Sequence, residues 1–142
     1  MKTVRQLLQM KGGQIYEIAP DARVFDALTL MAEREVGALV VTDGGRLAGI
    51  ISERDYARKV ILHGKSSHEM QVRDIMTAKV ITVHPGQTIE ECMALMTGKR
   101  IRHLPVIEWD RLIGVVSIGD LVKEVIAEQE QTIKQLESYI HS

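Results

Sequence analysis

A short polar motif occurs twice in this chain, and its residue types are suited to ligand binding. Residues 49–55 read Gly-Ile-Ile-Ser-Glu-Arg-Asp, and residues 114–120 read Gly-Val-Val-Ser-Ile-Gly-Asp. Each serine stands where a helix N-cap is expected, so capping alone explains it. The aspartate complements the helix dipole, but its carboxylate can also accept both hydroxyl hydrogens of a ribose while the helix N-terminus supplies N–H groups for a phosphate. From spacing alone, capping and ligand binding both stay open.

The sequence contains no complete motif for catalysis or for metal binding. Gly64-Lys65-Ser66 is half of a phosphate-binding loop, but Lys59 stands where the first glycine of that loop is required. Cys92 falls on the apolar face of a predicted helix, where a buried and inert thiol is expected. No histidine has a metal-ligand spacing. We therefore predict a protein that is not an enzyme and holds no metal, apart from magnesium brought in by a nucleotide.

Composition narrows the class of protein further. The chain has 142 residues, with 18 Lys and Arg against 19 Asp and Glu, so it lacks the basic excess of a general nucleic-acid or membrane-surface binder. A single cysteine excludes an internal disulfide. No apolar run approaches the roughly 18 residues of a membrane span, and the first residues lack a secretory signal. A cytoplasmic location is the default expectation.

The whole chain is organised by an internal duplication. Residues 15–61 align with residues 80–126 at an offset of 65 without a gap, and 12 of the 47 aligned pairs are identical. Both aspartates and both serines of the polar motif are among those pairs. Two copies are too few for a solenoid. We therefore expect two similar units that pack about a pseudo-twofold axis.

Each unit is predicted to be a strand, a helix, a two-stranded hairpin and a second helix, which gives an α/β (α+β) fold of two β-α-β-β-α motifs. In the first unit, alternation over 15–18 favours a strand and the spacing of apolar residues from Val24 to Met31 favours a helix. The second unit repeats this from a strand at 80–83. The expected organisation is an N-terminal segment (1–14), the first unit (15–62), a linker (63–79), the second unit (80–127) and a C-terminal helical extension (128–142).

The duplication, the two polar motifs and the run Ile-Arg-His-Leu-Pro-Val at 101–106 resemble a tandem pair of CBS domains, also called a Bateman module. The stretch from Ile51 to Lys59, with the downstream Gly-Lys-Ser-Ser, is similar to stand-alone members of that family in bacteria and plant organelles. The resemblance implies a module with two clefts that bind adenosine compounds: AMP, ADP, ATP, NAD or S-adenosylmethionine.

The family pattern, carried over position by position, implies which residues face each cleft. In nucleotide-binding members, the aspartate of one repeat holds the ribose and strands of the other repeat enclose the base and phosphate. One cleft would combine Ser52, Arg54, Asp55, Ile81, Arg102, His103 and Pro105. The other would combine Tyr16, Gly37, Ala38, Ser117 and Asp120.

This assignment predicts that the two clefts differ in charge. The cleft at Asp55 gathers Arg54 and Arg102, with His103 as a third cation if it is protonated, and is suited to phosphate groups. The cleft at Asp120 has glycine and alanine at the matching positions, so we expect it to be roomier and uncharged. The phosphate-rich ligand is therefore expected to bind more tightly at Asp55.

Two functions agree with these observations. The favoured one is a non-enzymatic sensor that binds an adenosine-containing ligand and signals to a separate, unidentified effector protein. The alternative is a structural module in which nucleotide binding is incidental. Ile126, Ile133 and Ile140 have heptad spacing in the last predicted helix, and this stripe requires a partner, either the body of the chain or another subunit of a homodimer.

Overall fold

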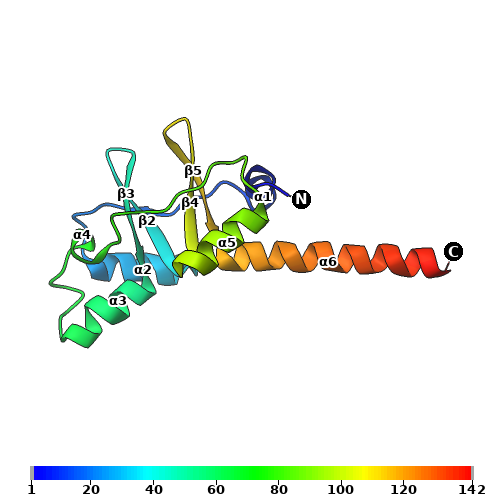
Figure 1. Ribbon diagram of the computed structural model, residues 1–142. Coiled ribbons are helices and arrows are strands. Elements are labelled where there is room, and N and C mark those ends of the chain that lie inside the picture. Colours follow the sequence, from blue (N-terminus) through cyan, green and yellow to red (C-terminus); the bar gives the residue numbers. More distant parts are fainter. Residues whose placement is uncertain (1, 142) are drawn as a thin grey trace.

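The protein has two similar halves that lie side by side (Figure 1). The structure is a computed structural model of residues 2–141; Met1 and Ser142, the end residues of the expected segments 1–14 and 128–142, lie outside it. In chain order the elements up to the linker are α1 (Val4–Lys11), β1 (Glu17–Ile18), α2 (Val24–Arg34), β2 (Ala38–Asp43), β3 (Arg46–Ser52), α3 (Glu53–Lys59) and the short 3-10 helix η1 (Ile61–His63). The remaining elements are α4 (Val72–Ile75), α5 (Ile89–Lys99), β4 (His103–Glu108), β5 (Arg111–Ser117) and α6 (Ile118–His141).

The two hairpins have the same pairing, as the duplication predicts. β2 pairs antiparallel with β3 and aligns Val41 with Gly49, while β4 pairs antiparallel with β5 and aligns Val106 with Gly114. Both hairpins contain a register shift directly after these pairs. The predicted α/β fold of two β-α-β-β-α motifs related by a pseudo-twofold axis is confirmed, with one difference in the second half.

The predicted strand at 80–83 is not formed, and this segment contributes only one bridge, between Val83 and Val106. In the first half, β1 lies parallel to β2, and the Val40 N–H donates to the carbonyl of Tyr16 at 3.3 Å. The equivalent of Val40 in the second half is Pro105. Proline has no N–H, so this bond of the ladder cannot form and the pairing is shortened.

Each half completes its hydrophobic core with a helix that precedes the other half. The core of the second half includes Val4, Leu7 and Leu8 of α1, all of them buried. The core of the first half includes Val72 and Ile75 of α4. The N-terminal and linker segments are therefore parts of the two packed cores, and the two halves interlock.

The glycine that opens each polar motif makes this interlock sterically allowed. A Cβ atom on Gly114 would lie 2.6 Å from Cδ2 of Leu8, which belongs to α1. A Cβ atom on Gly49 would lie 2.7 Å from Sδ of Met76 and 2.8 Å from the carbonyl oxygen of Thr77. The Thr77 N–H and carbonyl also bond to Ile50, at 2.9 and 3.0 Å. Any larger side chain at these two positions would push the preceding helix away from the strand.

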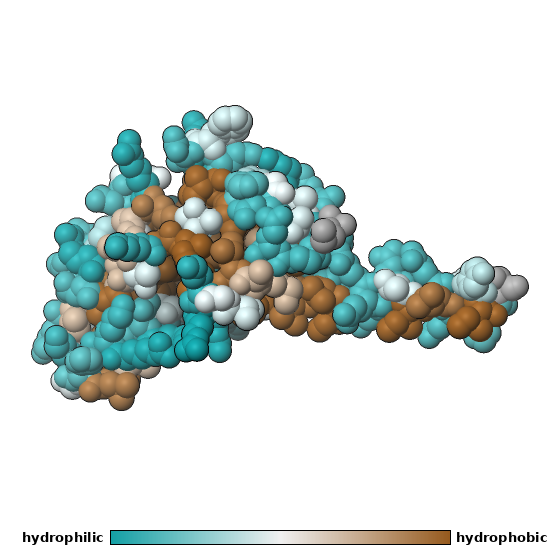
Figure 2. Space-filling model, viewed as in Figure 1, coloured by the Kyte–Doolittle hydropathy of each residue, from teal (hydrophilic) through white to brown (hydrophobic). Residues whose placement is uncertain are grey.

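Helix α6 extends well beyond the two halves (Figure 1). Ile126, Ile133, Leu136 and Ile140 are 50–75% exposed and lie outside both cores. Figure 2 shows hydrophobic residues along one side of this projecting part. Of the two partners considered from the sequence, packing on the body of the same chain is therefore excluded for these residues.

We expect Gly49→Ala to lower the free energy of unfolding by about 1–3 kcal/mol, the usual cost of overpacking a core. The new methyl group would meet the Thr77 backbone, which cannot move aside as the end of a side chain can. Urea unfolding followed by circular dichroism measures this. The control is Gly98→Ala, in α5, where nothing lies within 4 Å of the new Cβ and alanine should be neutral or stabilising. Equal stability of the two variants would contradict the proposed role of Gly49.

Candidate functional site

Two cavities lie where the halves meet. One has a volume of about 560 Å³ and is lined by Asp120, and the other has a volume of about 450 Å³ and is lined by Asp55. Both are lined by residues of both halves, and they share Gly37, Ile50, Arg102 and His103. Cavities of this size hold small molecules of the nucleotide class. We call them the Asp55 cleft and the Asp120 cleft.

The Asp55 cleft is built on the start of α3. The Ser52 N–H donates to Oδ2 of Asp55 at 2.9 Å, and the Asp55 N–H donates to Oγ of Ser52 at 3.3 Å, which makes a reciprocal capping box. Oδ1 of Asp55 lies 3.2 Å from Nζ of Lys59, one turn further along the same helix. The structure places six of the seven expected residues around this cleft: Ser52, Arg54, Asp55, Ile81, Arg102 and His103.

Pro105 is the expected residue that does not line the Asp55 cleft. It is buried within β4, and its carbonyl accepts a hydrogen bond from the Val83 N–H at 3.0 Å. The family pattern therefore placed Pro105 at a cleft that its side chain does not line in this structure. Pro105 shapes the segment at 80–83 through the N–H that it lacks.

Cationic side chains dominate the Asp55 cleft. Two carboxylates, those of Glu53 and Asp55, face six basic residues, which are Arg54, Arg58, Lys59, Lys79, Arg100 and Arg102. They come from the ends of α3 and α5 and from the segments next to β4 and α4. A concentration of positive charge at one cleft attracts polyanions such as phosphate chains.

The Asp120 cleft repeats the same capping box at the start of α6. The Ser117 N–H donates to Oδ2 of Asp120 at 2.9 Å, and the Asp120 N–H donates to Oγ of Ser117 at 3.1 Å. Tyr16, Gly37 and Ala38 line the same cavity, as expected. All five residues expected at this cleft are thus brought together.

Lys11 is a further residue of the Asp120 cleft that the sequence analysis missed. Its Nζ atom lies 2.6 Å from Oδ2 of Asp120 and donates to the carbonyl oxygen of Val115 at 2.8 Å. Burial raises the pKa of Asp120, but the hydrogen bonds from Lys11 and Ser117 and the charge of Lys11 outweigh it, so the pKa lies below its ordinary value. The carboxylate is therefore ionised well below neutral pH.

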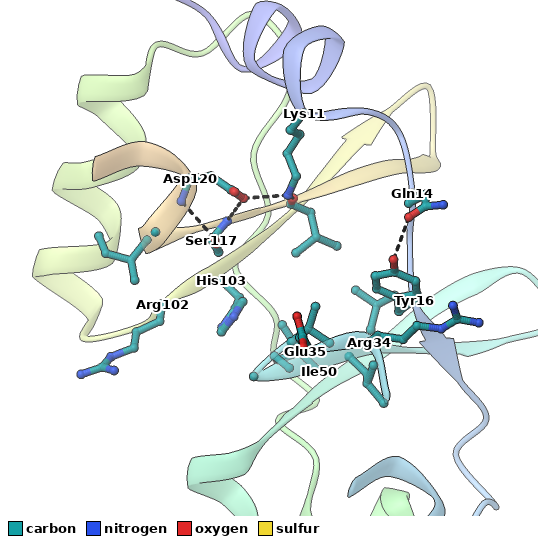
Figure 3. A pocket seen from close by; sticks show the side chains of 18 of the residues that line it. Lys11, Gln14, Tyr16, Arg34, Glu35, Ile50, Arg102, His103, Ser117 and Asp120 are labelled. Carbon is teal, nitrogen blue, oxygen red and sulfur yellow. Dashed lines mark hydrogen bonds and ion pairs between the residues drawn. The ribbon is translucent and has the colours of Figure 1, made fainter. Parts of the chain in front are cut away.

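The wall opposite Lys11 carries Tyr16 and Arg34 (Figure 3). The guanidinium carbon of Arg34 lies 5.5 Å from the centre of the Tyr16 ring, and the Tyr16 hydroxyl donates to Gln14 at 2.7 Å. With Lys11, Arg34, Arg102, Glu35 and Asp120 in its lining, the cleft carries charges of both signs. The expectation of a roomier cleft is confirmed by the volumes, but the expectation of an uncharged one is wrong.

His103 lines both clefts, and it is not the third cation that the sequence suggested. Burial lowers the pKa of His103 below its ordinary value, and Lys11 and Arg102 act in the same direction, against the opposing charge of Asp120. The side chain is therefore neutral at neutral pH. It can accept or donate a hydrogen bond between the two clefts without adding charge.

A second, shorter duplication would have revealed Lys11. Residues 4–11 read Val-Arg-Gln-Leu-Leu-Gln-Met-Lys, and residues 72–79 read Val-Arg-Asp-Ile-Met-Thr-Ala-Lys, at an offset of 68. Because this offset is three residues longer than the offset of 65 in the main repeat, an alignment of the main repeat does not show the match. Lys11 and Lys79 hold equivalent places in it, and each lines one cleft.

The capping boxes also change how the repeated aspartates are interpreted. Spacing alone explains only the serines by capping, but in the structure each aspartate also accepts a hydrogen bond from the N-cap backbone. Helix capping is thus a sufficient reason for the motif to recur. Ligand binding by the same carboxylates stays a prediction, which depends on their position in the clefts.

The described part of the chain has neither a metal site nor a reactive thiol. Within residues 2–141, no three His, Cys, Asp or Glu side chains gather as a metal site requires. Burial, with a smaller contribution from Glu91, raises the pKa of the Cys92 thiol to about 11. Such a thiol is a poor nucleophile at neutral pH. None of the described helices is long and apolar enough to cross a membrane.

Two interlocked repeats with two clefts between them define a tandem module. The family model "CBS domain" matches residues 13–62 and again residues 72–127. The chain therefore belongs to the CBS domain family and contains a tandem pair of these domains, as the resemblance in sequence implied.

Relatives and solved structures agree with this assignment. The mitochondrial CBS domain-containing protein CBSX3 of Arabidopsis thaliana is 44% identical over 147 aligned positions, which cover 97% of this chain and 71% of the relative. A solved protein with CBS domains from Burkholderia ambifaria is 54% identical, with a TM-score of 0.87 and coverage of 90% of this chain and 96% of the other.

A more distant structure shares the fold. It is the CBS domain pair of protein MJ0100, in complex with 5′-methylthioadenosine and S-adenosyl-L-methionine. Its TM-score is 0.80 at 22% identity, and the match covers 90% of this chain and 98% of that one.

We expect Asp120→Asn to lower the free energy of unfolding at pH 7 by about 1–2 kcal/mol, because it removes charge-assisted hydrogen bonding with Lys11. The pKa of Asp120 is lowered in the folded state, so its stabilisation is present above the ordinary pKa and is lost as the pH falls through the lowered one. Urea unfolding at pH 7 and pH 3 should therefore show the difference between variant and wild type shrinking on acidification. Asp21→Asn, at an exposed position, is the control and should have no effect at either pH. A difference that grows with acid would contradict this assignment.

Proposed function

We propose that this protein is a non-enzymatic sensor that binds adenosine-containing ligands in the two clefts and signals to a separate partner protein. The observation that carries the proposal is the composition of each cleft. A Ser-x-x-Asp helix start from one half faces strand-end residues of the other half, and this arrangement occurs twice. A ligand in either cleft would contact both halves at once.

The adenosine part of the proposal is supported by the cleft chemistry and by a structural neighbour. Each cleft offers an aspartate for a ribose diol, helix N–H groups for a phosphate and aliphatic wall residues such as Ile50 for a base. The MJ0100 pair, which has the same fold, holds two adenosine compounds. We propose an adenine nucleotide (AMP, ADP or ATP) or NAD as the ligand here.

The charge of the clefts supports different ligands in the two sites. Six basic residues and two carboxylates line the Asp55 cleft, whereas three basic residues and two carboxylates line the Asp120 cleft. We propose that the Asp55 cleft binds the ligand with more phosphates, such as ATP, and binds it more tightly.

Signalling would follow from the shared walls of the clefts. His103 and Arg102 line both cavities, so occupancy of one cleft changes the surroundings of the other. A ligand that binds one arrangement of the two halves more tightly shifts the population towards it by the difference in affinity. A partner protein that recognises the outer surface would detect this shift.

Binding rather than turnover is proposed because the clefts contain groups suited to holding a nucleotide, while the described residues form no metal site and the Cys92 thiol has a raised pKa. Hydrolysis of ATP or NAD by the purified protein would refute this part of the proposal. The cytoplasmic location stays a prediction, since the plant relative CBSX3 is a mitochondrial protein.

The projecting α6 favours a second role, in assembly. Ile126, Ile133 and Ile140 occupy one heptad position, and Leu136 lies between them on the same exposed stripe. We propose a second copy of this chain as its partner, in a parallel pair of helices. In that arrangement the flanking Glu130 and Glu137 face uncharged Val125 and Thr132 of the other copy, so like charges do not meet.

For ligand binding, we expect Asp55→Ala to reduce ATP affinity at least tenfold and Asp120→Ala to reduce it less, measured by isothermal titration calorimetry. The matched control is Asp74→Ala. Asp74 accepts from the Gln71 N–H at 2.9 Å in another capping box but lines neither cleft, so this variant loses a cap without losing a proposed ligand contact. Equal losses from the two cleft variants would contradict the assignment of ATP to the Asp55 cleft. An absence of ATP, AMP and NAD binding by the wild type would contradict the proposed function itself.

For assembly, we expect the wild type to be a dimer and Leu136→Asp to be a monomer, because two buried carboxylates would face each other in the helix pair. Size-exclusion chromatography with light scattering measures the mass. Gln131→Asp, on the opposite side of α6, is the control and should stay dimeric. A monomeric wild type, or a Leu136→Asp dimer, would show that α6 does not join two copies.

A further inference from the structure

The two clefts use different cations to balance their aspartates. In the first half, Asp55 is paired with Lys59 of its own helix, at 3.2 Å. The equivalent of Lys59 in the second half is Glu124, so the charge at this position is reversed. Asp120 and Glu124 are both acidic and lie one turn apart on α6. Helix α6 therefore cannot supply the cation that α3 supplies.

The N-terminal segment supplies these cations instead. Lys11, the last residue of α1, binds Asp120 at 2.6 Å, and Lys2 forms an ion pair with Glu124, which is only 5% exposed. A third ion pair, between Arg5 and Glu108, holds the same segment to β4. The charge of the Asp120 cleft thus depends on a lysine from a different element, one that does not belong to either repeat motif.

A ribose in this cleft would compete directly with Lys11. Oδ2 of Asp120 accepts from the Ser117 N–H and from Lys11, so the oxygen is already used twice. A diol that binds the carboxylate through both oxygens would compete for Oδ2 with the ammonium group, whose contact with Asp120 is drawn in Figure 3. The Lys11 side chain is 32% exposed, and without Asp120 its charge would need another anion nearby.

The chain around Lys11 allows such an exchange. Helix α1 ends at Lys11, and the next residue, Gly12, has φ of 90°. Neither Gly12 nor Gly13 has an atom within 4 Å of the position of a Cβ, so this stretch runs through open space. The Lys11 side chain can turn from Asp120 towards a group inside the cleft without moving the buried part of α1.

We propose that Lys11 is a specificity-determining residue that makes the Asp120 cleft select an adenosine ligand with a 5′-phosphate over the uncharged nucleoside. The ribose takes Asp120, and the phosphate becomes the new partner of the displaced ammonium group. A nucleoside offers no such partner, so its binding leaves a cation uncompensated. This inference rests on the proposed binding of adenosine compounds.

The test compares AMP with adenosine by calorimetry in an Asp55→Asn background, which weakens the other cleft. With Lys11 present, we expect AMP to bind about tenfold more tightly than adenosine, as a charge-assisted hydrogen bond predicts. In Lys11→Met, AMP affinity should fall while adenosine affinity stays equal or rises, because nothing has to be displaced from Asp120. The preference for AMP should then nearly disappear.

Two further variants show whether the charge of Lys11 is responsible. Lys11→Arg keeps the charge and should keep the preference for AMP. Lys79→Met removes the equivalent lysine of the other cleft and should leave the preference unchanged in this background. Circular dichroism shows whether each variant is folded. If Lys11→Met does not fold, Lys11→Gln takes its place in the test.

Two other sets of results would overturn this inference, and only one of them would also overturn the proposed function. If Lys11→Met weakens AMP and adenosine equally, or leaves the preference for AMP intact, Lys11 has only a structural role and this inference is overturned while the proposed function stands. If the wild type binds neither AMP nor adenosine nor any other adenosine compound, the proposed function and this inference are both overturned.

Discussion

The rest of this structure depends on one kind of contact, the close packing of a side chain against a glycine, which occurs once in each half. Leu8 of α1 packs on Gly114, and Met76, directly after α4, packs on Gly49. Because each of these segments precedes the opposite half in the chain, neither core is complete without residues from outside its own repeat. The same contacts lead the chain past the cavities, which is why Lys11 and Lys79 lie at the two clefts.

Because the two halves have the same backbone arrangement, the two clefts differ mainly in the charged side chains around their aspartates. Asp55 and Asp120 make the same capping box, so they start from equivalent positions. They differ in what lies one helical turn later, a lysine in α3 and a buried glutamate in α6. With this one reversal, Asp55 is paired with a lysine of its own helix, whereas Asp120 is paired with Lys11 of the N-terminal segment. Duplicated folds can thus separate the functions of two sites with few substitutions.

Much of the fold follows from the sequence because the repeat supplies each expectation twice. The hairpins, the capping serines and the grouping of Tyr16 with Asp120 all follow from the 65-residue offset and the family pattern. The absence of a strand at 80–83 does not follow from the repeat. It results from the missing N–H of Pro105, which lies on a different strand. The neutral state of His103 depends on burial, and the place of Lys11 depends on a contact across 109 residues. Neither is visible in local spacing.

The use of one carboxylate for two purposes would limit how strongly the Asp120 cleft binds a ligand. Asp120 caps α6 and pairs with Lys11, and a ribose must share or replace those bonds, so part of the gain in binding offsets what is lost. A site of this kind favours moderate affinity. Ligand binding would then affect the partners of the aspartate. If a ligand displaced Lys11, it would break one of the three ion pairs that the described residues form between the N-terminal segment and the second half. The end of α1 is therefore where occupancy of the Asp120 cleft would first reach the surface.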